Sequence, residues 1–72
     1  MINITITDGF VSFQSSVCGL VESEITECEV VEETSFHLGT NIGTFLINVQ
    51  QFSINSITFD TANEAVTYIT NH

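Results

Sequence analysis

The sequence contains no lysine and no arginine, although a chain of 72 residues with ordinary composition would carry about 8 of them. This absence excludes two classes of function. Proteins that bind nucleic acid directly obtain their affinity for phosphates from these two side chains. Schiff-base chemistry requires a lysine, and phosphoryl transfer usually requires a cation or a bound metal on the developing charge. We therefore expect a protein that is not an enzyme and makes no direct contact with nucleic acid.

The chain also lacks the patterns that direct proteins to a membrane. A secretory signal begins with basic residues, and a transmembrane helix needs about 20 consecutive apolar residues. Neither pattern occurs. We expect a protein of the host-cell cytoplasm or of a virion, which no signal peptide exports and which has no membrane partner. In a reducing cytoplasm Cys18 and Cys28 are expected to stay reduced, with one disulfide between them as the alternative.

No spacing in the sequence resembles a known metal or cofactor site. The residues that could bind zinc are ten, nine and thirty-five positions apart, unlike those of a finger or ribbon: Cys18, Cys28, His37 and His72. Asp8 and Gly9 lack the repeated aspartates of a calcium-binding loop. A nucleophilic pair of a cysteine with His37 would have no residue to orient it. We expect no metal, no cofactor and no catalytic residue.

The composition that remains is that of a folded protein, because 43% of the residues are apolar and only 12% are charged. Residues 1–72 are expected to form a single small domain. This length is close to the lower limit at which a hydrophobic core is stable by itself, so a partner or a homo-oligomer would add stability.

The first fifteen residues predict a β-hairpin over 2–15. Isoleucines alternate with polar residues up to Asp8 and Gly9, a pair that suits a two-residue turn with positive φ. A turn of this length pairs Thr7 with Phe10. Each step back along the first strand then pairs with one step forward along the second, so Ile6 pairs with Val11 and Ile4 with Phe13. One face of the hairpin then carries the apolar residues Ile4, Ile6, Val11 and Phe13.

The segment 17–33 is ambiguous, because its glutamates and its apolar residues both occur at odd and at even positions. As a strand it would have no clearly apolar face. Glutamate favours a helix, with an apolar stripe that includes Leu20, Val21, Ile25 and Cys28. Gly19 and the β-branched residues favour a strand. We favour the strand.

Residues 34–59 contain no charged side chain, and they predict two or three strands. A turn is expected around Gly39–Asn41 and a break at Asn55–Ser56. Because an exposed edge of this composition would aggregate, we expect the segment to lie at the centre of the sheet or beneath a partner.

Thr61 and Glu64 match a capping box, and the residues after them predict an α-helix over about 61–70. The expected fold is therefore α+β. It consists of a small antiparallel β-sheet of about 4–6 strands, with one C-terminal helix packed on it.

Nine carboxylates give the chain a net charge of −9. Asp8 has a structural explanation as a turn residue, and Asp60 and Glu64 have one at the start of the helix. The other six lie within twelve positions and are the expected partner-binding residues: Glu22, Glu24, Glu27, Glu29, Glu32 and Glu33. A charged edge that only maintains solubility is the alternative interpretation, but such an edge would tolerate lysines among its acids.

These observations predict a small acidic binding protein, of the kind found in phages and mobile elements. It would inhibit or occupy a basic, nucleic-acid-binding protein partner by charge mimicry, and apolar residues such as Val30, Val31 and Phe36 would hold the complex. The alternative is a structural subunit, such as a virion or capsid accessory protein, that oligomerises through the uncharged segment 34–59. Both are interaction proteins without an active site.

Overall fold

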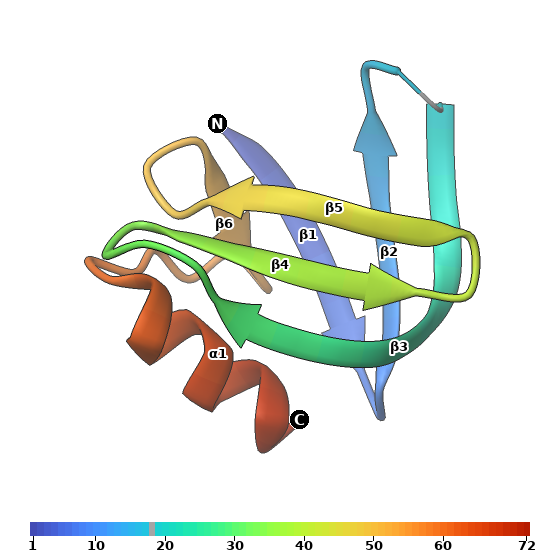
Figure 1. Ribbon diagram of the computed structural model, residues 1–72. Coiled ribbons are helices and arrows are strands. Elements are labelled where there is room, and N and C mark those ends of the chain that lie inside the picture. The colour runs from blue at the N-terminus through green and yellow to red at the C-terminus, as the bar shows by residue number, and fades with distance from the viewer. Residues whose placement is uncertain (18) are drawn as a thin grey trace.

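The computed structural model describes residues 1–17 and 19–72, which form six strands and one helix (Figure 1). Their bounds are β1 (Ile2–Thr7), β2 (Phe10–Ser15), β3 (Gly19–Val30), β4 (Ser35–Thr40), β5 (Gly43–Asn48), β6 (Phe52–Ile54) and α1 (Ala62–Thr70). The strands make one sheet in the order β5-β4-β3-β2-β1-β6. The α+β class with a single C-terminal helix is therefore confirmed.

The N-terminal hairpin has the register that the sequence predicts. Thr7 pairs with Phe10 and Ile6 with Val11. Asp8 and Gly9 both have positive φ, at 51° and 74°, which is the conformation of a two-residue turn whose twist matches that of the strands. The expected apolar face is the buried one: Ile4, Ile6, Val11 and Phe13.

Within the ambiguous segment, residues 19–30 form a strand, β3, and not a helix. Its first half pairs with β2 and its second half with β4. Between the halves, Ile25 pairs with Thr40 whereas Glu27 pairs with Gly39, so Thr26 is an extra residue that forms a β-bulge. Bulges bend a strand and increase its twist. The sheet accordingly folds over, and β4 and β5 cross in front of β1 and β2 in Figure 1.

The uncharged segment forms three strands, but its expected central position holds only for β4. Strands β5 and β6 are the two ends of the sheet. The hairpin turn between β4 and β5 lies at Asn41 and Ile42, because Thr40 already pairs with Gly43. Strand β6 runs parallel to β1, which makes the sheet mixed, whereas the sequence predicted antiparallel pairing throughout.

The core lies between the two halves of the folded sheet, and α1 covers β3 and β4. Phe36 and Leu38 of β4 are fully buried there, together with Ala62 and Ala65 of α1. The predicted cap is confirmed, because the Thr61 hydroxyl accepts a hydrogen bond of 3.3 Å from the backbone N–H of Glu64. The helix therefore begins where the sequence indicates.

Candidate acidic docking surface

Four of the six predicted glutamates form one row on the outer face of β3. Glu22 and Glu24 are both exposed and have even positions, whereas Glu27 and Glu29 are exposed and have odd positions. Alternate residues of a regular strand point to opposite faces, so an unbroken strand would separate the two pairs. The bulge at Thr26 reverses the alternation between them. We call the resulting group, Glu22, Glu24, Glu27 and Glu29, the acidic row.

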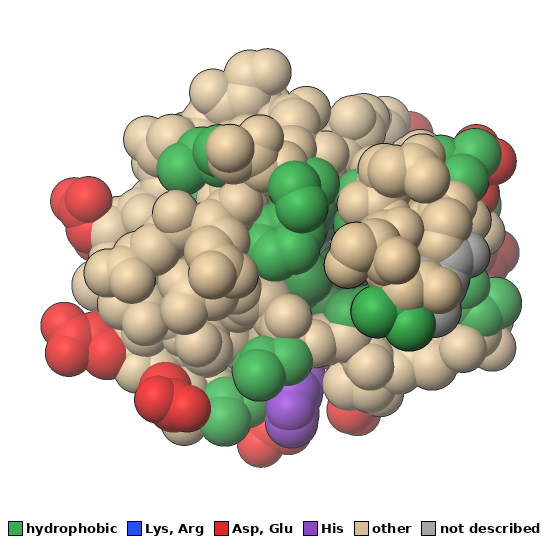
Figure 2. Space-filling view, turned by 90° about the horizontal axis from the view of Figure 1, so that it is seen from above, with side chains coloured by type: hydrophobic (Ala, Val, Ile, Leu, Met, Phe, Trp, Pro, Cys, Tyr) green, Lys and Arg blue, Asp and Glu red, His purple; other side chains and the backbone are tan. Residues whose placement is uncertain are grey.

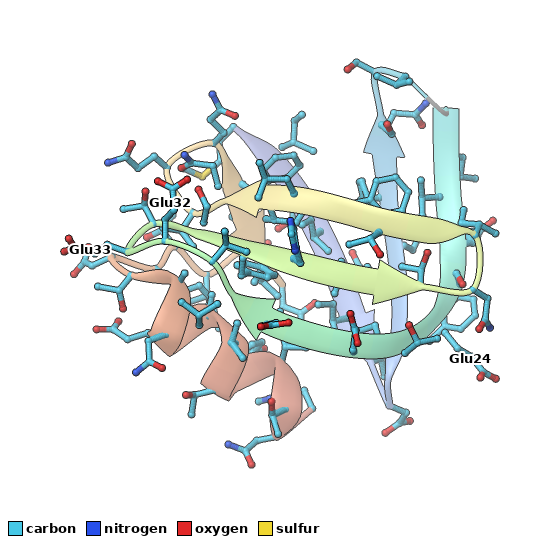
Figure 3. The ribbon with its side chains drawn as sticks, in the orientation of Figure 1. Glu24, Glu32 and Glu33 are labelled. Atoms are coloured by element: carbon cyan, nitrogen blue, oxygen red, sulfur yellow. The ribbon has the colours of Figure 1, made fainter. Side chains whose placement is uncertain are left out.

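Measured along the strand, the acidic row is nearly as long as the molecule is wide. Within each pair the two residues are about 6.6 Å apart along the strand, and the whole row would measure about 23 Å on a straight strand. The principal extents of the molecule are 25, 22 and 21 Å. Strand β3 curves (Figure 3), and a row on its outer side therefore cannot be straight.

The neighbours of the acidic row are small, polar or apolar side chains. Ser12 and Phe10 of β2 lie opposite Glu22 and Glu24. On β4, Gly39 lies opposite Glu27 and His37 opposite Glu29. Phe10 is 44% exposed, so it is an apolar contact within reach of a partner that the sequence did not indicate.

Glu32 and Glu33 do not continue the acidic row. They follow the end of β3, in a bend where the Glu33 carbonyl accepts a hydrogen bond of 2.7 Å from Ala62 at the start of α1. In Figure 3 the two residues lie together at the end of the molecule opposite Glu24. The hydrogen bond from Ala62 places the start of α1 beside Glu33, at a distance from the acidic row.

The apolar residues expected beside the glutamates differ in their accessibility. Val30 and Val31 are 40% and 46% exposed and can contact a partner. Phe36 is fully buried, because β4 turns it into the core, so it cannot take part in binding as the sequence suggested.

The described residues among those considered for catalysis or metal binding, Cys28, His37 and His72, are not assembled into a site. Cys28 points inward and is a free thiol, whereas His37 of the neighbouring strand is exposed on the outer face. Burial raises the pKa of Cys28 from 9.0 to about 11, which keeps it protonated at neutral pH. His72 stacks on the ring of Tyr68 at the end of α1. Cys18 lies outside the described residues.

Within residues 1–17 and 19–72, no three histidine, cysteine or acidic side chains are placed to share a metal ion, and no pocket is present. The described part of the chain also contains no helix with the length and apolar character needed to cross a membrane. No protein-family model, curated protein or solved structure significantly matches this chain.

Proposed function

We propose that this protein is a non-enzymatic binding protein that occupies the basic, nucleic-acid-binding surface of a protein partner through the acidic row. The observation that supports the proposal is the bulge at Thr26, because it gathers four carboxylates on one exposed face with no lysine or arginine anywhere in the chain. A strand that needed charge only for solubility would gain nothing from this alignment. Basic residues between the acids would serve solubility equally well.

The mimicry concerns the sign and the linear arrangement of the charges. Within each pair of the row, one carboxylate follows another every 6.6 Å or so, whereas one strand of duplex DNA presents a phosphate about every 3.4 Å along its axis. The row therefore imitates a short, less dense polyanion. Such a charge pattern increases the rate of encounter with a basic cleft, and its effect decreases as salt increases.

Apolar side chains beside the acidic row would then stabilise the complex. Phe10 lies opposite Glu24, and Val31 follows the end of β3. They are 44% and 46% exposed. Val30 pairs with the buried Phe36, so it points to the opposite face of β3 from the acidic row and is not part of this surface. Burial of aromatic and aliphatic anchors usually supplies most of the affinity of a protein interface, while the charges around them set the rate and the choice of partner.

The proposal is tested by capture from a lysate of the source cell at about 50 mM salt, followed by elution with increasing salt. The matched control replaces the four glutamates of the acidic row by glutamine, which keeps their shape and removes their charge. We expect the natural protein to retain nucleic-acid-binding proteins that duplex DNA competes away, and the glutamine variant to lose them. Retention of the same proteins by both forms would show that the acidic row is not the binding surface.

A further inference from the structure

The sheet has two ends, and only one of them is protected by the chain itself. Strand β6 is three residues long, and the N–H and carbonyl of its last residue, Ile54, both bond to Ile57 at 2.9 Å. This turn closes the outer side of β6 at that position. Strand β5 has six residues, and among the strands of residues 1–17 and 19–72 only β4 lies beside it.

The outward backbone groups of β5 follow from its hairpin. A two-residue turn pairs Thr40 with Gly43, so Gly43, Phe45 and Ile47 direct their N–H and carbonyl groups toward β4. The N–H and carbonyl groups of Thr44 and Leu46 must then point away from the sheet. Strand β5 has no proline, bulge or charge, which are the usual devices that prevent an edge strand from pairing with another chain.

A second open edge, in β3, differs from β5 in its charge. Strand β4 joins β3 only from Ile25 onward, so the preceding residues have β2 as their one neighbour. That edge carries Glu22 and Glu24, and like charges directly opposite each other oppose pairing with a second copy. Strand β5 carries instead Leu46, which is 60% exposed.

On the face that contains the β5 edge, apolar and acidic side chains occupy different areas. Strand β5 lies above β4 in Figure 1, and Figure 2 views the molecule from that side. Apolar side chains occupy the middle of this face, and aspartates and glutamates lie around its margin. Two copies that met by their β5 edges would therefore keep their carboxylates apart.

We infer that β5 pairs with β5 of a second copy, antiparallel about a two-fold axis, so that the two sheets become continuous. A second copy fits better than a basic partner because neither β5 nor the adjacent β4 has a carboxylate that would attract a cation. Two molecules with a charge of −9 can approach closely only where they carry none. The sequence left open oligomerisation through the whole uncharged segment 34–59, whereas pairing through β5 limits the contact to that strand. This pairing does not depend on the acidic row.

The dimer is weak, because pairing of two six-residue edges buries less than the roughly 1,200 Å² of a stable interface. Sedimentation equilibrium at about 0.01 to 1 mM protein, the range suited to weak association, is the first test. We expect the mass to rise with concentration from 7.9 kDa toward twice that value. Salt should strengthen association by screening the repulsion between the copies, whereas it weakens binding to a basic partner. A constant mass of 7.9 kDa at every concentration and salt would overturn the inference.

Two leucines provide a matched pair of variants, since Leu46 of β5 is 60% exposed and Leu20 of β3 is 59% exposed. Leu46→Glu should weaken the dimer about tenfold or more, because it adds a negative charge to the paired edge of two acidic molecules. Leu20→Glu introduces the same charge elsewhere and should leave association within about twofold of that of the natural chain. Equal weakening by both substitutions would contradict a β5 interface.

Amide hydrogen exchange tests the backbone pairing in the unmodified protein. The amides of Thr44 and Leu46 have no partner strand in the monomer, so they should become protected as the concentration rises. The amides of Phe45 and Ile47 bond to β4 in both states and serve as the internal reference. Association without protection of Thr44 and Leu46 would place the interface elsewhere.

Discussion

The side chain of Glu27 lies across Gly39 on the outer face of the sheet. A Cβ atom at position 39 would lie 2.7 Å from the Cγ of Glu27 and 3.0 Å from the hydroxyl oxygen of Thr26. Both contacts come from the bulge, where β3 gains its extra residue opposite β4. The missing side chain of Gly39 therefore makes room for the segment that aligns the acidic row.

We expect Gly39→Ala to lower the free energy of unfolding by about 1 to 3 kcal/mol, as overpacking commonly does. The cost should be smaller in a Glu27→Ala background, because that substitution removes the Cγ atom that the new methyl group meets. Urea unfolding of the two single variants and the double variant measures the difference. Equal costs in the two backgrounds would show that Glu27 is not the obstacle.

Asn55 extends the pairing of β1 beyond the end of β6. Its side-chain oxygen accepts a hydrogen bond from the Ile6 N–H at 2.8 Å, and its amide nitrogen donates to the Ile6 carbonyl at 2.8 Å. The same nitrogen donates to the hydroxyl of Tyr68 at 2.9 Å. One side chain thus continues the sheet and attaches the helix to it.

Asn55→Ala should lower the free energy of unfolding by about 2 to 3 kcal/mol, because it leaves two backbone groups and a hydroxyl without their partner. It also places alanine at a φ of 51°, where asparagine is better tolerated. Ser56→Gly is the control, since glycine suits the φ of 66° at that position. We expect the control to remain within about 0.5 kcal/mol of the natural protein. Similar losses for both variants would contradict a specific role for Asn55.

The buried thiol of Cys28 should make stability depend on pH in the alkaline range. Burial raises its pKa from 9.0 to about 11, so the folded protein retains this proton more strongly than the unfolded chain does. The resulting stabilisation is complete below pH 9 and is lost as the pH rises to about 11.

Unfolding measured from pH 8 to pH 11 in the natural protein and in Cys28→Ala isolates this contribution. The difference in unfolding free energy between the two should shrink over that interval. The substitution leaves the other thiol and the tyrosine unchanged, so their titration affects both proteins alike. A constant difference would show that Cys28 ionises as readily in the folded state as in the unfolded chain.

Salt should stabilise the isolated protein, because no lysine or arginine offsets the repulsion among its carboxylates. Raising the salt concentration from low ionic strength to about 0.5 M shortens the range of this repulsion to a few ångströms. We expect the melting temperature to rise by about 5 °C. The glutamine variant of the acidic row should show a smaller rise, and an equal rise would assign the effect to other acids.

Local patterns in the sequence predicted the elements that depend on neighbouring residues. The hairpin follows from the alternation before Asp8 and Gly9, and the helix start follows from Thr61 and Glu64. Asn55 and Ser56 also form the expected break, each with positive φ. These features were predictable because their hydrogen bonds and conformations are set within a few positions of the chain.

The bulge at Thr26 was not predicted, although the spacing of the glutamates is a sign of it. The glutamates change from even to odd positions between Glu24 and Glu27, so a regular strand over this segment would have no apolar face. A strand with one extra residue resolves the conflict, but its place depends on where β2 ends and β4 begins to pair. The acidic row became evident only from those two partners.

The sequence by itself determined the sign of the charge, the absence of compensating cations and the type of most elements, because these depend on composition and local spacing. Tertiary structure decided which acids share a face and which strands lie at the ends of the sheet. Pairing of Asn3 in β1 with Ser53 in β6 joins residues fifty positions apart, and no local pattern encodes such a contact. The free edge of β5 and the alignment of the acidic row likewise depend on which strands pair and in what order.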